Sequence, residues 1–323
     1  MEFQLLKTED HERWDEFVDI SPQGSLFAKT YYLDAIGLPY EVGVLKKNDI
    51  IKGGIVLAKN ELHLFANPLL AKYLGILLCP IESKYVYRLT EEKKIIEQIV
   101  SHLNQRSFDY TFHPAFKNWL PFYWKGYRQT TRYTYRIKDL TQLEQIVKAA
   151  ASRVRKNLRK AERHNIYIDD NISVEEFYSV NQLAFKRQGG PIPYSFSFFT
   201  RFHDRLKKRN AIELLAARDR QGQIHAVCGI VYDRQCGYLL FNGSNPDLTN
   251  VEANSLLVMK TIEYAAKITD AFDFEGSMLK PIERFYRGFG GEMTAYMNIW
   301  KHNSLNSFKR FALKLYKRIR YGK

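Results

Sequence analysis

The sequence has few cysteines, no metal-binding spacing and no long hydrophobic run. Its three cysteines, Cys79, Cys228 and Cys236, form no CxxC pair, and so sparse a set favours buried thiols in a reducing compartment. The eight histidines show no HxxxH or HExxH spacing, so we expect no metal site. No run of about 18 apolar residues occurs and the N-terminus lacks a basic segment followed by an apolar one. We therefore expect a cytoplasmic protein without a transmembrane segment.

Acidic residues are also in short supply. The chain holds 49 Lys and Arg against 35 Asp and Glu, a net charge of +14, which favours an anionic partner such as nucleic acid, a phosphorylated substrate or an anionic membrane face. Two segments carry much of this excess: 148–163 contains a single acid, Glu162, and 301–323 contains none. The length of 323 residues indicates about two domains, and a hydrophobic content of 45% is enough for packed cores.

The two halves of the chain show the same order of helical and strand patterns. In the second half the apolar spacing predicts helix, helix, three strands, helix, strand, helix and strand over 174–188, 197–210, 211–219, 224–233, 236–244, 255–269, 270–276, 279–287 and 291–301. The first half gives the same order over 9–19, 26–36, 40–47, 50–59, 62–68, 90–106, 108–114, 116–124 and 127–137. This pattern predicts two copies of one α/β unit; a chance likeness between two α/β domains is the alternative.

A cluster of glycines, Gly288, Gly290 and Gly291, first suggests a phosphate-binding loop. Such a loop comes after a strand and before a helix. Here the glycines come after a predicted helix and before a predicted strand, and the segment FYWKGY at 122–127 echoes FYRGF at 285–289. The cluster is therefore predicted to be a repeated helix end, where glycine permits a left-handed turn.

The connector between the halves is predicted to be one basic helix over 140–168. Thr141 and Glu144 have the spacing of a capping box at its start. A line of cations follows at Arg155, Lys156, Arg159 and Arg163. This line is either the solvated face of a packed helix or a surface for a polyanion, such as tRNA, a phosphorylated carrier or lipid headgroups.

The C-terminal segment, 303–323, has the pattern of a basic amphipathic helix. Its apolar residues fall on one side and its Lys and Arg residues on the other. We expect this helix either to dock on the first domain or to lie on an anionic membrane. Docking is favoured because the apolar stripe is narrow.

Three stretches, 152–166, 241–277 and 282–293, together resemble the Fem peptidyltransferase family and its Fem-like relatives in the GNAT acyltransferase superfamily. The resemblance implies an α/β fold of two tandem GNAT-like domains, each a mixed sheet flanked by helices, joined by the basic helix and without a coiled-coil arm. The implied limits are 1–139 for the first domain and 140–302 for the second, with the C-terminal helix after them.

The resemblance also implies acyl transfer to an amine. Better known members move an amino acid from aminoacyl-tRNA to a peptidoglycan precursor peptide, and other relatives are thought to use acyl-CoA. No bound cofactor is implied, only an acyl donor as co-substrate, either aminoacyl-tRNA or an acyl-thioester. Tyr286 replaces the lysine of the family pattern. Tyr194 and Phe198 fall where the family has an arginine and a tyrosine that bind the phosphates of the precursor, and neither can serve as a cation. Arg187 or Arg201 is therefore expected to supply the positive charge for those phosphates.

The candidate catalytic residues follow from where the central strands are expected to part. In GNAT-like folds backbone N–H groups near the splayed strands polarise the acyl carbonyl, and here those strands are expected at 224–232 and 236–244. Asn242 and Ser244 would face the opening. Glu275 is the candidate base or amine-holding group, with Tyr286 beside it. The alternative for Glu275 is a structural ion pair with Arg284 or Arg287, which are otherwise candidate substrate-binding residues.

The loop before the helix at 255–269 bears on the acyl donor. Its segment TNVEAN, 249–254, has no glycine and no base, and it places Glu252 where a CoA pyrophosphate would lie. Asn254 is expected to cap the helix. Three functions stay open: an aminoacyl- or acyltransferase acting on a cell-envelope or peptide amine, an acyl-thioester-dependent N-acyltransferase acting on a small molecule or glycan, and a non-catalytic GNAT-like protein that binds RNA or membrane.

Overall fold

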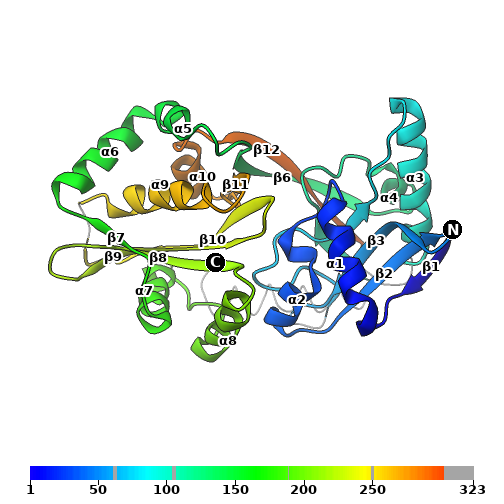
Figure 1. Ribbon diagram of the computed structural model, residues 1–323, viewed down its shortest axis with the longest axis horizontal. Helices are drawn as coiled ribbons and strands as arrows, with labels where there is room; N and C mark the ends of the chain where they lie inside the picture. The colour runs from blue at the N-terminus through cyan, green and yellow to red at the C-terminus, as the bar shows by residue number, and fades with distance from the viewer. Residues whose placement is uncertain (61–63, 104–106, 188, 249–250, 302–323) are drawn as a thin grey trace. The chain divides into compact units, whose positions relative to one another are not determined.

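The computed structural model describes residues 1–60, 64–103, 107–187, 189–248 and 251–301 (Figure 1). The chain forms two compact units, one of Met1–Arg132 with the described part of Ala295–Lys323 and one of Tyr133–Thr294. The C-terminal helix predicted over 303–323 lies outside the described residues. Among the helices that are described, none is both long enough and apolar enough to cross a membrane.

The first unit contains an antiparallel sheet in the order β1 (Glu2–Leu5), β2 (Tyr40–Lys47), β3 (Ile50–Ala58) and β4 (Ile76–Leu78). Its helices cover both faces, because a Cβ on Gly53 would lie 2.6 Å from Ile95 of α3 (Tyr85–Ser101), while one on Gly54 would lie 2.5 Å from Trp14 of α1 (His11–Ile20). The remaining elements are η1 (Thr8–Asp10), η2 (Leu26–Ala28), α2 (Thr30–Ile36), β5 (Phe108–Thr111) and α4 (Leu120–Trp124).

The second unit is one mixed sheet with helices on both faces. Its strands follow the order β6 (Arg128–Ile137), β11 (Ala271–Asp273), β10 (Cys236–Ser244), β9 (Ile224–Tyr232), β8 (Ile212–Arg218) and β7 (Tyr167–Asp169). Only β10 and β11 run parallel among the pairs in this series. Figure 1 shows α6 (Ser152–Arg163), α9 (Ala253–Ala265) and α10 (Lys280–Arg287) on one face, and α7 (Val174–Arg187) and α8 (Phe196–Lys207) on the other.

The repeat is confirmed by this element order, and each unit adds a short edge strand, β1 or β7, that was not predicted. The last strand of each repeat pairs with a strand of the other repeat: β6 ends the first repeat and pairs in the second unit, and β12 (Glu292–Lys301) ends the second repeat and pairs in the first unit. Residues Arg136 and Ile137 of β6 pair with β11, while residues Asn298–Lys301 of β12 pair with β5. The predicted domain limits, 1–139 and 140–302, do not take account of this exchange of strands, and they stay a prediction.

Three local predictions were wrong. The described residues of the strand predicted at 62–68 form only isolated bridges, at Phe65 and Ala66, and the third strand is β4 instead. The connector is two helices rather than one, α5 (Leu143–Ala149) and α6, because Ala150 is extended and the Ala151 N–H donates to the Gly288 carbonyl at 2.8 Å. Thr141 does not cap α5, since its hydroxyl donates to Asp139 Oδ1 at 2.6 Å.

The glycine cluster is a helix end, as predicted. Helix α10 ends at Arg287, and Gly290 then adopts a left-handed conformation with φ of 83°. The first repeat does the same, with α4 ending at Trp124 and Gly126 at φ of 75°. Only glycine takes this conformation without steric cost, so both repeats use it to turn from helix to strand.

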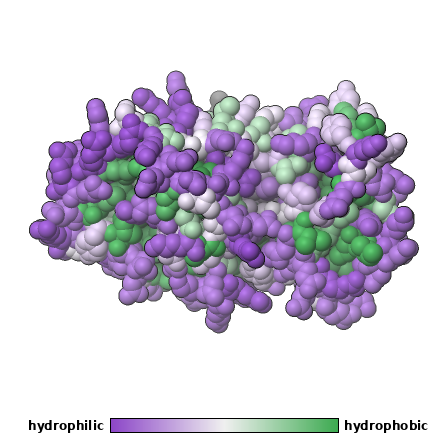
Figure 2. Space-filling model, turned by 45° about the horizontal axis from the view of Figure 1, so that its top comes forward, coloured by the Kyte–Doolittle hydropathy of each residue, from purple (hydrophilic) through white to green (hydrophobic). Residues whose placement is uncertain are grey.

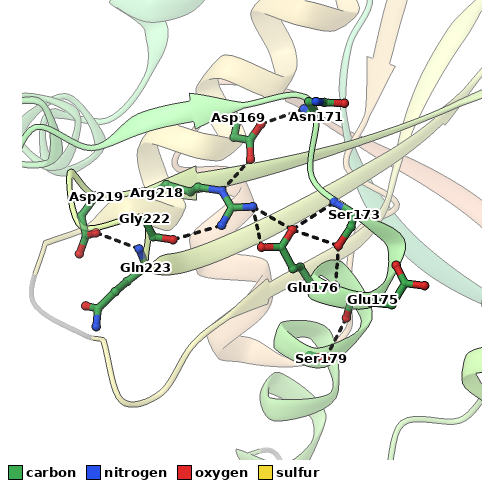
Figure 3. A network of polar contacts seen from close by, with 10 residues as sticks. All are labelled: Asp169, Asn171, Ser173, Glu175, Glu176, Ser179, Arg218, Asp219, Gly222 and Gln223. Atoms are coloured by element: carbon green, nitrogen blue, oxygen red, sulfur yellow. Dashed lines mark hydrogen bonds and ion pairs between the residues drawn. The ribbon is translucent and has the colours of Figure 1, made fainter.

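A polar network fixes the edge strand of the second unit (Figure 3). Arg218 of β8 donates from Nε to Asp169 Oδ2 of β7 at 2.6 Å and from Nη2 to both carboxylate oxygens of Glu176 at 3.0 Å. Ser173 and Glu176 form a reciprocal capping box at the start of α7. One guanidinium thus joins two strands and a helix start.

This network makes stability depend on pH. Burial opposes ionisation of Asp169 and Glu176, but hydrogen bonds from Arg218 and from the Asn171 and Ser173 N–H groups outweigh it and lower both pKa values. A carboxyl whose pKa is lowered on folding stabilises the native state above its unfolded pKa. That contribution is lost as the pH falls through the folded pKa.

We expect Arg218→Met to lower the free energy of unfolding at pH 7 by about 1–2 kcal/mol, because these carboxylates are partly exposed and screened. Urea denaturation between pH 7 and pH 3 should show a shallower pH dependence for the variant than for the native chain. Arg220→Met, on the neighbouring turn, is the matched control. Parallel pH profiles for Arg218→Met and the native chain would contradict the assignment.

A second polar group, Asp273 at the end of β11, is completely buried. It accepts hydrogen bonds from Thr134 Oγ1 at 2.6 Å and from the Glu275 N–H at 2.8 Å, and Arg136 Nε lies 3.4 Å from its other oxygen. Burial disfavours the charge of Arg136, but the adjacent Cys236 and Asp273 outweigh it and raise its pKa. Asp273 therefore binds β6 to β11 and fixes the backbone that follows.

Removing this carboxylate leaves the largely buried guanidinium of Arg136 without its counter-ion. We expect Asp273→Ala to lower the free energy of unfolding by about 3–5 kcal/mol. Asp273→Asn should lower it less, because the amide oxygen still accepts from Thr134 and Glu275. Urea denaturation checks both, with the exposed Asp270→Ala as control; a loss for Asp273→Ala no larger than that of Asp270→Ala would refute the role.

Candidate functional site

The central strands of the second unit part at a defined place. β11 pairs with β10 only from Cys236 to Tyr238, and a register shift between Leu239 and Phe241 marks a bulge in β10. Beyond it, no strand in the described part of the chain pairs with this edge of β10. The expected splay between β9 and β10 was wrong, because those two strands stay paired to Ser244. The opening is between β10 and β11.

Asn242 lies on this stretch of β10. Its Nδ2 donates to Cys228 Sγ on β9 at 3.3 Å, so it faces the side of the sheet covered by α9 and α10. Burial raises the pKa of the Cys228 thiol to about 12, although hydrogen bonds with Thr261 and Asn242 oppose the rise. Cys228 is therefore a neutral thiol and not a nucleophile. Ser244, two residues along β10, shares the face of Asn242 and is partly buried.

Tyr286 of α10 reaches the same region. Its ring lies 5.5 Å from that of Phe274, centroid to centroid, and packs against the core of the second unit. Burial raises the pKa of Tyr286 above its ordinary value, and the nearby Cys228 thiol and Glu275 carboxylate raise it further. The phenol thus stays protonated at neutral pH and can donate a proton.

Glu275 follows β11 in a left-handed conformation, with φ of 56°. Non-glycine residues seldom adopt this conformation, and it is held here by the hydrogen bond from the Glu275 N–H to Asp273. The strand predicted over 270–276 therefore ends at Asp273, and Glu275 lies in the turn that follows it. Glu275 is partly buried and close enough to Tyr286 to affect its pKa.

Asn242 and Tyr286 therefore both lie near Cys228, and Glu275 lies near Tyr286. Arg287 of α10 pairs with Glu283, with Nε 3.0 Å from Oε1, and Tyr135 donates to the same oxygen at 2.5 Å. The side chain of Arg284 is exposed. Glu283 thus links α10 to Tyr135 of β6, and Arg287 forms an ion pair within α10. The substrate-binding role of Arg284 and Arg287 stays a prediction.

The other predicted substrate-binding residues lie on the opposite face of the sheet. Tyr194 is buried in an aromatic cluster of α7 and α8, with its ring 5.9 Å from Phe241, and its hydroxyl accepts from Asn181 Nδ2 at 2.6 Å. Phe198 stacks on Phe202 in the same cluster, and Arg187 is exposed at the end of α7. These three residues are not grouped with Asn242 and Tyr286; their substrate-binding role stays a prediction.

The cations of α6 are not equivalent. Arg155 Nη1 donates to the carbonyl oxygen of Lys148 at 2.8 Å and also to that of Ala150, so it joins α5 to α6. Lys156, Arg159 and Arg163 are exposed. The predicted polyanion-binding line is therefore available at three of its four positions.

The start of α9 differs from the prediction for Asn254. The N-cap is Glu252, in a left-handed conformation with φ of 60°, and it makes no side-chain capping bond. Asn254 lies inside the first turn, and its buried Oδ1 has no hydrogen-bond partner among the described residues. Glu252 nevertheless places a carboxylate at the helix start, as the sequence suggested.

Sequence reasoning missed two residues that shape the site, Asp273 and Cys228. A lone acid between Phe272 and Phe274 in a buried strand was the available signal for Asp273. Cys228 was expected only to be buried, and its contact with Asn242 depends on strand register. Within the described residues, no three His, Cys, Asp or Glu side chains form a group that could hold a metal ion.

Comparison with known families identifies a domain within the second unit. Residues 148–277, which span α6 through β11, match the model of the acetyltransferase (GNAT) domain. No curated protein matches the sequence.

Solved structures resemble the chain along nearly its whole length. FemX matches with a TM-score of 0.67 at 10% identity, over 92% of this chain and 97% of FemX. A tandem GNAT protein from the clavulanic acid biosynthesis pathway matches with a TM-score of 0.55 at 10% identity, over 93% and 97%. L-PGS from Bacillus licheniformis matches with a TM-score of 0.53 at 12% identity, over 97% of each chain.

At these identities the structures establish the fold alone, which is the predicted pair of GNAT-like units without a coiled-coil arm in the described residues. The activity follows from the domain model matched by residues 148–277. The chain is an acyltransferase, and residues 148–277 of its second unit match the acetyltransferase (GNAT) domain model.

Proposed function

We propose that the chain transfers an acyl or aminoacyl group to an amine of a cell-envelope or peptide substrate, with the chemistry at Asn242, Glu275 and Tyr286. The observation that carries this proposal is the grouping of these three side chains where β10 and β11 part. It supplies a carboxylate, a protonated phenol and an unpaired strand edge in one place.

The reaction forms an N–C bond and breaks the ester or thioester bond of the donor. Glu275 accepts the proton that the attacking amine loses, directly or through one water. The N–H groups on the free edge of β10, with the Asn242 amide, stabilise the negative charge on the carbonyl oxygen. Tyr286, a protonated phenol at neutral pH, gives its proton to the departing oxygen or sulfur.

Removing either proton-transfer group should slow the chemical step. We expect Tyr286→Phe and Glu275→Gln each to lower kcat by about 10²-fold or more with little change in KM, because proton transfer acts in the transition state. Tyr123→Phe is the control for Tyr286, since Tyr123 holds the corresponding place in FYWKGY and is exposed.

The measurement is steady-state transfer to a panel of amines, with a donor that the native chain uses, and thermal melting confirms folding. Native rates in both variants would refute the site.

Glu252 bears on the choice of donor. The N-terminus of a helix favours anions, but a carboxylate at that position repels a pyrophosphate. We therefore favour an aminoacyl-tRNA donor over acyl-CoA. The exposed cations Lys156, Arg159 and Arg163 of the same unit support a polyanionic donor such as aminoacyl-tRNA. An acyl-thioester donor is the second candidate. The match to an acetyltransferase domain argues against a non-catalytic protein.

Neutralising Glu252 should improve the binding of a phosphorylated thioester. We expect Glu252→Gln to lower the Kd for acetyl-CoA by about two- to fivefold, measured by isothermal titration calorimetry in low salt. Glu263→Gln, near the other end of α9, is the control. Tight acetyl-CoA binding by the native chain, unchanged in Glu252→Gln, would instead favour the acyl-thioester donor.

A further inference from the structure

The first unit contains a cavity of about 740 Å³, within the size range of small-molecule sites. Its floor includes the buried apolar side chains Leu78, Ile96 and Phe116. Three exposed side chains, Tyr85, Leu89 and Leu120, also line it and therefore lie at its mouth. In Figure 2 apolar side chains reach the surface on the right of the view, among hydrophilic ones.

The cavity has a defined place in the repeat. It is bounded by the end of β4, the start of α3 and the segment before α4. In the second unit the corresponding elements are β10, α9 and the segment between β11 and α10, which surround the candidate active site. That segment carries Glu275 in the second unit, whereas residues 112–119 of the first unit, FHPAFKNW, contain no acid. The cavity therefore lacks a counterpart of the candidate base.

One side of the cavity is rich in hydrogen-bond donors. Asn118 lines it, and its buried Nδ2 makes no hydrogen bond with any described residue. Helix α3 has no side-chain cap at its start, and Lys117 is exposed at the lining. Two acids also line the cavity: Glu92 lies 3.8 Å from Arg88, and Glu82 is exposed. An unpaired buried donor is costly, so the site favours a ligand that brings an acceptor oxygen.

We propose that the first unit binds a single-chain amphiphile with a carboxylate head group in this cavity. The alkyl chain lies over Leu78, Ile96 and Phe116, and the head group accepts from Asn118 near the start of α3. The inference does not depend on the proposed function, because none of these residues belongs to the candidate active site.

Trp119 lines the cavity and reports on its occupant. We expect 12-bromododecanoate, kept below its micelle concentration, to quench the fluorescence of the full chain in a saturable way. The Trp119→Phe variant should lose most of that quenching. Unbrominated carboxylates of eight to twelve carbons, used as competitors, should bind about fourfold more tightly for each added methylene until the cavity is full.

Variants separate the chain site from the head-group site. Ala115→Phe fills the cavity and should weaken binding at least tenfold, whereas Ala295→Phe, an exposed change in the same unit, should not. Leu120→Asn at the exposed mouth is a second variant that does not disturb the core. Asn118→Leu should weaken dodecanoate by about two- to tenfold and leave dodecylamine, which has no acceptor oxygen, unchanged.

Several outcomes would overturn the proposal. They are quenching that does not saturate, equal quenching in Trp119→Phe, and affinity unchanged by both Ala115→Phe and Leu120→Asn. Binding to phosphatidylglycerol vesicles without binding of monomeric dodecanoate would assign the exposed side chains to a membrane surface instead, which also refutes the cavity site. Transfer activity is not part of this test, so its failure leaves the proposed function unaffected.

Discussion

The buried carboxylate of Asp273 is the interaction on which the second unit depends. It ends β11, binds Thr134 and Arg136 of β6, and holds the N–H of Glu275. Because β11 stops there, β10 continues past its bulge paired with β9, and no described strand pairs with its other edge. The same carboxylate thus joins the sheet and creates the gap beside it. These contacts explain why an acidic residue occurs at this position of an otherwise apolar strand: it pairs with β6 and holds the turn that ends β11.

The sheet of the second unit divides the candidate residues predicted from the sequence into two groups, one on the face covered by α7 and α8 and one on the face covered by α9 and α10 (Figure 1). On the side of α7 and α8, Phe241 and Tyr194 pack together in a buried aromatic cluster. The side of α9 and α10 holds Asn242, Cys228 and Tyr286 near partly buried Glu275. Phe241 and Asn242 are adjacent in sequence and face opposite sides, so the alternation of β10 after its bulge decides which residues can take part in chemistry.

Much of the fold was predictable because its signals are local. Apolar periodicity located α7, α9 and β10 to within a few residues, and glycine chemistry explained the joint at Gly290. The short strands β1, β4 and β7 have too few residues to show a period. The break at Ala150 depends on the distant Gly288 carbonyl, and the exchange of β6 and β12 depends on pairing that no local pattern encodes. The candidate site was predictable as residue types but not as a grouping, since Asn242 meets Cys228 only through strand register.

The two repeats show how one fold can divide its tasks. Both repeats turn from helix to strand at a glycine. The cavity of the first unit lies at the end of β4, and the candidate site of the second unit lies beside the corresponding strand, β10. In the second unit the following segment carries Glu275 and an inward Tyr286, while in the first it carries no acid and Tyr123 is exposed. Proton transfer needs the carboxylate and the phenol, whereas binding an apolar chain needs only enclosed surface and one donor such as Asn118. The difference between the repeats is therefore one of side chains at equivalent places, and it supports the proposed chemistry in the second unit and the proposed binding site in the first.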